Sequence, residues 1–248
     1  MLKRLLIVTV LLTLLYPATL ITAQEETKTP VITYGETASG EISNLNFDVE
    51  YFFEGEAGDV IVITMFRSET ADFDPYLYLT TTENEVLASN DDFFDRNSQI
   101  VARLPETRTY QIVATRLGER TGSGQGAYQV TLEKAQPFSS GVTVEGTVEA
   151  EQMSAGHVFV PEAAGIYTVT YKQVRGDFYP ALVISRIAPD STYTEEIARL
   201  SGQTLRGGSL VLEIEMDSIY IINLQADYYN YETAGTSSVY TINVEEAE

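Results

Sequence analysis

The sequence predicts an all-β protein in which two tandem β-sandwich domains, jelly-roll-like in character, follow a secretory signal peptide. Three observations favour this class. Short runs of β-branched and aromatic residues alternate with Gly, Asn, Asp and Ser at a spacing typical of sandwiches. Helical i, i+3, i+4 periodicity is nearly absent. The second half of the chain repeats landmarks of the first half in the same order, which indicates a duplicated domain.

Residues 1–23 have the layout of a signal peptide. Lys3 and Arg4 precede an apolar run over residues 5–15, and a small-residue exit places the cleavage site after Ala23. The apolar run is shorter than the roughly 20 residues that a membrane span needs, so an uncleaved anchor is the less favoured alternative. The chain contains no cysteine, which excludes disulfides and attachment of a lipid to a cysteine. We therefore expect a secreted protein that is extracellular or associated with the cell envelope.

The charge of the chain limits its partners. The formal net charge is -21, and removal of Lys3 and Arg4 with the signal peptide leaves 13 basic and 36 acidic residues, a net charge of -23. A body this acidic repels nucleic acid and anionic membrane surfaces, and it suits binding of divalent cations. A hydrophobic content of 44% with 16 tyrosines argues against disorder. We expect no nucleic-acid partner and no stable membrane insertion after cleavage.

The first sandwich is expected over residues 32–134, after a polar lead-in over residues 24–31. Its expected strands are short runs bounded by turn-forming residues, and they cover residues 60–66, 76–79, 86–88, 100–102, 110–113 and 128–132. The best helical pattern in the chain covers residues 194–200 and predicts one or two helical turns within a loop.

The second sandwich is expected over residues 141–248, after a linker over residues 135–140. Gly40 and Gly58 are 18 residues apart in the first half, and Gly146 and Gly165 are 19 apart in the second. The final strands also match, and we expect each pair to form a hairpin: residues 109–112 with 128–130, and residues 219–222 with 240–242. Matched landmarks in one order predict two related domains. The short linker predicts that they lie close together.

Several motifs of the first domain carry a family resemblance: Gly40-Glu41-Ile42, Glu50-Tyr51-Phe52-Phe53, Ala57-Gly58-Asp59, Asp72-Phe73-Asp74-Pro75-Tyr76-Leu77-Tyr78-Leu79, Leu87-Ala88-Ser89-Asn90-Asp91-Asp92, Thr109-Tyr110-Gln111-Ile112 and Gly126-Ala127-Tyr128. Together they resemble the bacterial pre-peptidase C-terminal domain, a β-sandwich appended to many secreted enzymes, over residues 32–133. Residues 141–245 look like a diverged copy that keeps the strands and loses the acidic motifs. The resemblance implies attachment, targeting or substrate binding, sometimes with calcium. We expect no peptidase domain before the two modules in this chain.

One group of acidic residues is a candidate metal-binding site. Residues 76–79 and 86–89 are expected to pair antiparallel around a turn at residues 82–84, which places residue 74 opposite residue 92. The side chains gathered at that end of the sheet are Asp72, Asp74, Asn90, Asp91, Asp92 and Asp95. Calcium takes six to eight oxygen ligands, and no His or Cys lies nearby to favour zinc or copper. The equally weighted alternative is a turn whose side chains cap backbone amides, and a functional acid pair is a third reading.

The corresponding residues of the second domain predict no ion there. They read Asp177, Tyr179 and, in the following turn, Ser201-Gly202-Gln203. Calcium is therefore expected in the first domain alone.

Catalytic signatures are missing from the sequence. The single histidine, His157, lies in a predicted strand without a G-x-S-x-G nucleophile motif, and neither cysteine nor HExxH is present. The glycine-rich segment over residues 122–126 precedes a strand and lacks the P-loop lysine, so it predicts a hairpin turn. We expect no catalytic residues and no enzymatic activity, with a hydrolase that uses an unrecognised carboxylate pair as an alternative.

Loop aromatics suggest a second kind of site. Tyr228, Tyr229 and Tyr231 lie in the last turn of the second domain, and Phe93 and Phe94 lie in the acidic loop of the first. Such side chains can stack on sugars or anchor a protein partner, or they can fold back over the ends of the sandwiches. The sequence predicts a secreted, non-catalytic binding or accessory module for adhesion or substrate targeting, whose partner is an extracellular polysaccharide or protein. A dedicated carbohydrate-binding protein is the first alternative.

Overall fold

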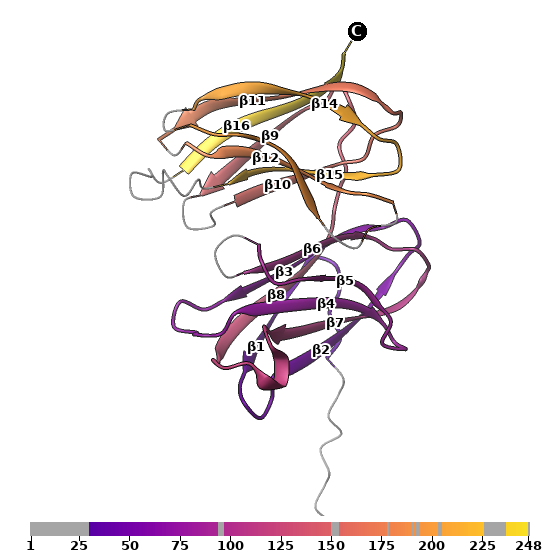
Figure 1. Cartoon of the computed structure of the whole chain (residues 1–248), viewed down its shortest axis with the longest axis vertical. Coiled ribbons are helices and arrows are strands. Elements are labelled where there is room, and N and C mark those ends of the chain that lie inside the picture. The colour runs from indigo at the N-terminus through magenta and orange to yellow at the C-terminus, as the bar shows by residue number, and fades with distance from the viewer. Residues whose placement is uncertain are drawn as a thin grey trace, which may run out of the picture.

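The computed structural model of the chain describes residues 30–93, 97–149, 154–177, 179–189, 191, 194–202, 205–225 and 237–247. The predicted signal peptide lies outside these residues. Two β-rich domains are stacked along the long axis of the molecule (Figure 1). The predicted class, two tandem β-sandwiches, is confirmed.

The first domain is an eight-stranded jelly roll. Its elements are β1 (Glu36–Ile42), β2 (Asp48–Gly55), β3 (Val60–Arg67), β4 (Pro75–Thr81), β5 (Val86–Asn90), β6 (Ser98–Arg103), β7 (Arg108–Arg116), the 3-10 turn η1 (Glu119–Thr121) and β8 (Gly126–Lys134). One antiparallel sheet has the order β1-β8-β3-β6 and the other has the order β2-β7-β4-β5. Consecutive strands alternate between the two sheets, except that β4 and β5 form a hairpin.

Alternation of side chains explains how each strand contributes to the core. In β3, Ile61, Ile63 and Met65 are fully buried between the two sheets, while Val62 and Thr64 point to the other face. A period of two residues places every second side chain on the same face of a strand, so each strand supplies one apolar row to the sandwich. The resulting core includes Phe53, Phe73, Leu77, Leu79, Tyr110, Ile112 and Leu132.

The second domain repeats the first strand by strand. Its strands are β9 (Thr143–Glu149), β10 (Ser154–Phe159), β11 (Gly165–Gly176), β12 (Ala181–Ile187), β13 (Glu195–Leu200), β14 (Gly207–Ile214), β15 (Ile219–Gln225) and β16 (Ser237–Glu246). The sheets have the orders β14-β11-β16-β9 and β10-β15-β12-β13. These are the orders of the first domain with each strand number raised by eight. A separate core forms between them, around Phe159, Tyr171, Ile184 and Ile222.

The duplication extends to an irregularity in the ladder. The register between β4 and β5 shifts between Leu79 and Thr80, and that between β12 and β13 shifts between Ile184 and Ser185. Leu79 pairs with Ile112, and Ile184 pairs with Ile222, so the two shifts lie at equivalent positions. A β-bulge at the same place in both copies supports a common origin of the two domains.

A matched glycine and tyrosine connect the first and last strands of each domain. Gly40 pairs with Tyr128 and Gly146 pairs with Tyr240, and a Cβ on either glycine would lie 2.3 or 2.4 Å from the tyrosine hydroxyl. The tyrosine ring therefore covers the glycine, a packing in which no larger residue fits at either glycine position. This contact explains why glycine stands at both landmarks.

Two sequence-based expectations about secondary structure were wrong. The expected final hairpins do not form, because β7 and β8 belong to different sheets, as do β15 and β16. The segment predicted to be helical forms strand β13 instead. The bulge next to Ser185 lets Ile197, Ala198 and Leu200 all pack towards the core, and this spacing resembles one face of a helix in sequence.

The domains dock through one sheet of each. We call these the inner sheets, β1-β8-β3-β6 and β10-β15-β12-β13, and we call the other two the outer sheets. The contact is a small aliphatic cluster made of Val60, Val101, Val158, Ile187, Ile219 and Ile221. Arg103 adds a hydrogen bond across the junction, donating to the carbonyl of Asp217 at 3.3 Å. In the described part of the chain, no helix is long and apolar enough to cross a membrane.

Candidate functional site

The acidic residues predicted to gather at one end of the β4–β5 hairpin are partly brought together. The two strands are antiparallel partners, as predicted, with a turn at residues 81–85 in which Asn84 has a positive φ of 65°. Leu77 pairs with Asn90, so the register at the acidic end differs by one residue from the predicted one. The extra residue is Leu87, which the bulge inserts opposite Leu79 and Thr80.

Two of the predicted ligands bind backbone groups. The carboxylate of Asp72 accepts a hydrogen bond from the amide of Gln125. The Oδ1 atom of Asn90 accepts one from the amide of Gln99 at 3.3 Å, and the carbonyl of Asn90 accepts another from the Ser98 hydroxyl at 2.7 Å. These contacts correspond to the turn-capping alternative.

Among the predicted ligands that the structure describes, no metal centre is formed. Within the described residues, no group of three or more His, Cys, Asp or Glu side chains is arranged to hold a metal ion. Asp74 contributes its carbonyl to a hydrogen bond with the amide of Leu117 at 2.8 Å. Asp95 lies outside the described residues. Calcium binding by the first domain therefore stays a prediction.

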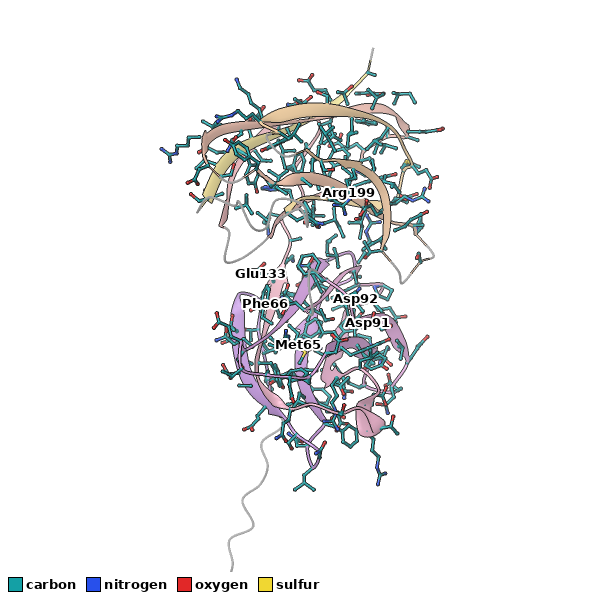
Figure 2. All side chains as sticks on the ribbon, turned by 60° about the vertical axis from the view of Figure 1, so that its left-hand side comes forward. Met65, Phe66, Asp91, Asp92, Glu133 and Arg199 are labelled. Carbon is teal, nitrogen blue, oxygen red and sulfur yellow. The ribbon has the colours of Figure 1, made fainter. Side chains whose placement is uncertain are left out.

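The acidic loop lies at the junction between the domains. Figure 2 shows Asp91 and Asp92 on the side of the first domain that faces the second, with Arg199 across the junction. Asn90, Asp92 and Phe93 line a crevice of about 260 Å3 together with residues of β12, β13 and β15. One of these, Glu196, is held by Arg199 through two hydrogen bonds of 2.9 and 2.7 Å. We call this space the interdomain crevice.

The predicted loop aromatics are only partly described. Phe93 is half-buried in the interdomain crevice, and its amide donates to the carbonyl of Asn97 at 2.6 Å. Phe94, Tyr228, Tyr229 and Tyr231 lie outside the described residues. Phe93 thus contacts the space between the domains.

A different aromatic group stands on the outer sheet of the first domain. Tyr76 and Tyr78 are successive outward-facing residues of β4, and their ring centroids are 4.7 Å apart. The Tyr78 hydroxyl donates to the carboxylate of Glu119 at 2.6 Å, and the Tyr76 hydroxyl donates to Ser89 at 3.4 Å. Burial and the neighbouring Glu119 carboxylate raise the pKa of Tyr78 above its ordinary value, so this hydroxyl stays a donor. We call Tyr76 and Tyr78 the tyrosine pair.

The alternation of residues in β4 predicts the tyrosine pair, although the loop positions of the other aromatic residues do not. In Tyr76-Leu77-Tyr78-Leu79 the leucines are buried in the core, and the tyrosines alternate with them on the opposite face. Aromatic residues at regular outward positions of a strand are candidates for a binding surface as much as loop aromatics are. The period of two residues was the available evidence.

His157 has a structural role in the second domain. Its Nε2 atom lies 2.8 Å from the buried Tyr240 hydroxyl, and its ring packs against Phe138. Burial lowers the pKa of His157, so the imidazole is neutral near pH 7. The ring also lines a second space of about 490 Å3 between the domains, opposite Lys134. No nucleophile hydrogen-bonds to the imidazole within the described residues, so His157 forms no catalytic pair there.

The glycine-rich segment after η1 encloses an arginine. Arg116 is almost fully buried, and its guanidinium donates to Asn44 Oδ1 and to the Glu119 carbonyl, each at 3.0 Å, and to the carbonyl of Gly124. Gly124 has a φ of 93°, and a Cβ at this position would lie 2.7 Å from the carbonyl oxygen of Asp72. The segment therefore connects the two sheets rather than forming the expected hairpin turn.

Comparisons with known proteins give structural likenesses only. No family model matches the sequence, and no curated protein matches it. Among solved structures, the pre-peptidase C-terminal domain of collagenase from Bacillus anthracis is similar at 12% identity and a TM-score of 0.36, over 43% of this chain and 95% of that domain. The CBM22-1-CBM22-2 tandem domain of Xyn10C from Paenibacillus barcinonensis is similar at 7% identity and a TM-score of 0.26, over 79% of this chain and 82% of that one.

A third similar structure comes from a virus. The turret protein A223 of Sulfolobus turreted icosahedral virus matches at 13% identity and a TM-score of 0.23, over 86% of this chain and 98% of that one. At these identities and scores, the likenesses assign neither a family nor a ligand. Membership of the pre-peptidase C-terminal family stays a prediction from the motifs of the first domain.

Proposed function

We propose that the protein is a secreted, non-catalytic binding module that attaches to an extracellular polysaccharide through the tyrosine pair. The observation that carries this proposal is the placement of Tyr76 and Tyr78, side by side on a sheet face that the second domain does not cover. Tyrosine presents a broad apolar ring together with a polar tip, which suits contact with the faces and hydroxyls of sugars.

The comparison with the second domain shows that folding does not require these tyrosines. Tyr78 pairs with Val113 and Val183 pairs with Asn223, at equivalent places in the two sheets. The residues that correspond to Tyr76 and Tyr78 are accordingly Ala181 and Val183. The second copy has small, buried aliphatic residues at these positions, on the sheet that docks against the first domain, whereas the first copy has aromatic rings on a sheet that the second domain does not cover.

The tyrosine pair is held in one arrangement before any ligand binds. Ring contact and the hydrogen bonds to Ser89 and Glu119 restrict both side chains. Restricting rotamers in advance lowers the entropy lost on association, which favours binding at a shallow surface. Glu119 also places a carboxylate beside the rings, so neutral polysaccharides are favoured over acidic ones. Adhesion and targeting to a polysaccharide surface both follow from such a site.

Retention on insoluble polysaccharides tests this function. The purified chain would be incubated with cellulose, chitin, xylan and isolated cell wall, and the bound fraction would be measured. Tyr76→Ala with Tyr78→Val introduces the residues of the second domain, and it is expected to reduce retention at least tenfold with little change in melting temperature. Phe66→Thr is the matched control, because Phe66 is an exposed aromatic residue on the inner sheet.

Two outcomes would contradict the proposal. Equal retention of the wild type and the double variant would remove the tyrosine pair from binding. Release of soluble sugar during incubation, abolished by changing one carboxylate, would favour the hydrolase alternative. Tyr228→Ala and Tyr231→Ala test the loop aromatics in the same assay, and a loss of retention confined to these variants would move the site to the second domain.

A further inference from the structure

The interdomain crevice is built from polar side chains of both domains. Asn90, Asp92 and Gln99 line it from the first domain, and Ser185, Asn223 and Gln225 line it from the second. Its volume of about 260 Å3 is slightly below the range of sites for drug-sized ligands, and it fits a ligand the size of a single sugar ring. The space adjoins the aliphatic cluster that docks the domains, since Val101 and Ile221 belong to both.

Two of the lining residues, Asn223 and Ser185, are mostly buried and have polar side chains that reach the crevice. Asn223 is 7% exposed and Ser185 is 8% exposed. Within the described part of the chain, neither side chain has a protein hydrogen-bond partner, and neither contributes to the fully buried unpaired polar atoms there, so both groups are open to water or a ligand in the crevice. Both residues lie at outward positions of the inner sheet, so their free groups face the crevice. Water or a ligand in that space is their expected partner.

The first domain shows that these polar groups are not a requirement of the fold. Asn223 corresponds to Val113, since each pairs with the equivalent residue of the neighbouring strand. Ser185 corresponds to Thr80, which turns its hydroxyl towards the carbonyl of Gln111 at 3.5 Å. The second domain has thus placed an unpaired amide where the first domain has a valine. The amide is therefore available to water or to a ligand in the crevice.

We propose that the interdomain crevice binds one neutral, hydroxyl-rich ring, such as a sugar residue, between the two domains. The amides of Asn223, Gln225 and Asn90 supply donors as well as acceptors, and Asp92 supplies a carboxylate acceptor. Adjacent hydroxyls of a sugar need this mixture of donors and acceptors. No lysine or arginine is among the described lining residues, so the crevice offers an anionic ligand no charge partner. Phe93 provides an apolar wall.

This site is separate from the tyrosine pair, because it involves the inner sheets and the tyrosine pair stands on an outer sheet. A ligand in the crevice contacts both domains and therefore favours their docked arrangement. Binding is expected to raise the melting temperature of the full chain as the ligand concentration rises.

Titration of the full chain with small neutral sugars tests the proposal. The probes are the methyl glycosides of glucose, galactose, mannose and xylose, together with N-acetylglucosamine, and glucuronate serves as the anionic comparison. Saturation-transfer NMR and calorimetry would measure binding, with chelator present in a parallel series. At least one neutral probe is expected to bind saturably in the millimolar range, and glucuronate is expected to bind at least tenfold more weakly.

Asn223→Val is the decisive variant. It introduces the residue of the first domain, so it is expected to keep or raise the melting temperature while weakening sugar binding at least tenfold. Ser185→Ala provides a second variant with a smaller loss, and Tyr76→Ala with Tyr78→Val is the control that keeps crevice binding.

Several results would overturn the proposal. These are no saturable binding of any neutral probe, unchanged binding by both crevice variants, equal binding of glucuronate, and loss of binding on addition of chelator. The last of these would identify a cation as the ligand. Failure of polysaccharide retention by the tyrosine pair, in contrast, would leave this result unaffected.

Discussion

The two domains share one topology and use equivalent surfaces differently. In the second domain, Val183 and Ile221 belong to the sheet that docks against the first domain. In the first domain, the equivalent sheet is an outer sheet, and Tyr78 stands where the second domain has Val183. Inward-facing positions have stayed apolar in both copies, while outward-facing positions have diverged. A duplicated sandwich thus keeps the side chains that form its core and changes the surface that each copy presents.

One inward-facing position is an exception, because it carries a polar side chain in both domains and differs between them. Tyr51 pairs with Ile112 and His157 pairs with Ile222, so the two residues are equivalent. The Tyr51 hydroxyl lies 2.9 Å from the Tyr128 hydroxyl, and His157 Nε2 lies 2.8 Å from the Tyr240 hydroxyl. Each domain therefore places a polar contact beneath its glycine–tyrosine pair, but only the second domain uses a group that titrates near neutral pH.

The largest expected effect concerns domain docking. Val62 pairs with Val101 and Thr168 pairs with Val211, so Val101 and Val211 are equivalent, yet they are 6% and 65% exposed. Val101→Lys would bury a charge in the aliphatic cluster, at a cost of several kcal/mol, so we expect the domains to separate. Val211→Lys is expected to change stability by less than about 0.5 kcal/mol.

Small-angle X-ray scattering and cleavage in the linker around residues 135–140 would measure docking in both variants. A larger radius of gyration for Val101→Lys alone is the expected result, together with loss of sugar binding in the interdomain crevice. Equal behaviour of the two lysine variants would show that the aliphatic cluster does not hold the domains together.

The second largest expected effect is the pH dependence of stability that His157 gives to the second domain. Because burial lowers the pKa of His157 in the folded state, the unfolded chain binds the proton more readily. The histidine's contribution to stability is complete above its ordinary pKa of about 6.5, and it is lost as the pH falls through that value to the folded pKa. His157→Tyr, which introduces the residue of the first domain, is expected to remove this dependence.

Urea unfolding at pH 7.5 and 5.5 would measure the effect in the second domain. Lys134 and Glu133 also line the space beside His157, and Tyr240 contacts it, but these groups are present in both proteins. The difference between the wild type and His157→Tyr therefore isolates the histidine. Parallel pH profiles for the two proteins would contradict the prediction.

The smallest expected effect is that of calcium on the first domain. The acidic motif predicts that about 10 mM calcium raises its melting temperature, with a gain of about 1.4 kcal/mol for a dissociation constant of about 1 mM. Asp74→Ala combined with Asp91→Ala is expected to remove the gain. Identical melting curves with calcium and with chelator would count against a site in this loop and would leave turn capping as the role of Asp72 and Asn90.

Much of the fold could be predicted from local patterns. The strand segments, the β4–β5 hairpin and the existence of a duplication follow from a period of two residues and from repeated landmarks. Which strands pair with one another could not be predicted so well. Residues 109–112 and 128–130 are close in sequence but occupy different sheets, because a jelly roll alternates its strands between layers.

Helix propensity gave a wrong prediction for the segment that pairs with β12 through a β-bulge. Residues 195–200 contain good helix formers, but pairing with β12 supplies hydrogen bonds and burial that an isolated helical turn lacks. The equivalent bulge in the first domain moved the acidic register by one residue. A bulge depends on how two strands pack together, and neither strand alone records it.

The sequence by itself determined the two sandwiches and the acidic character of the chain, because alternation, repetition and charge are properties of the residues in order. Only the tertiary structure decided which outward faces meet. That choice placed Asn223 opposite Asp92 in a crevice and left Tyr76 and Tyr78 on the other side of the molecule. The reason is physical: a strand pattern specifies which side chains leave the core, but the partner of an outward face depends on contacts between residues far apart in the chain.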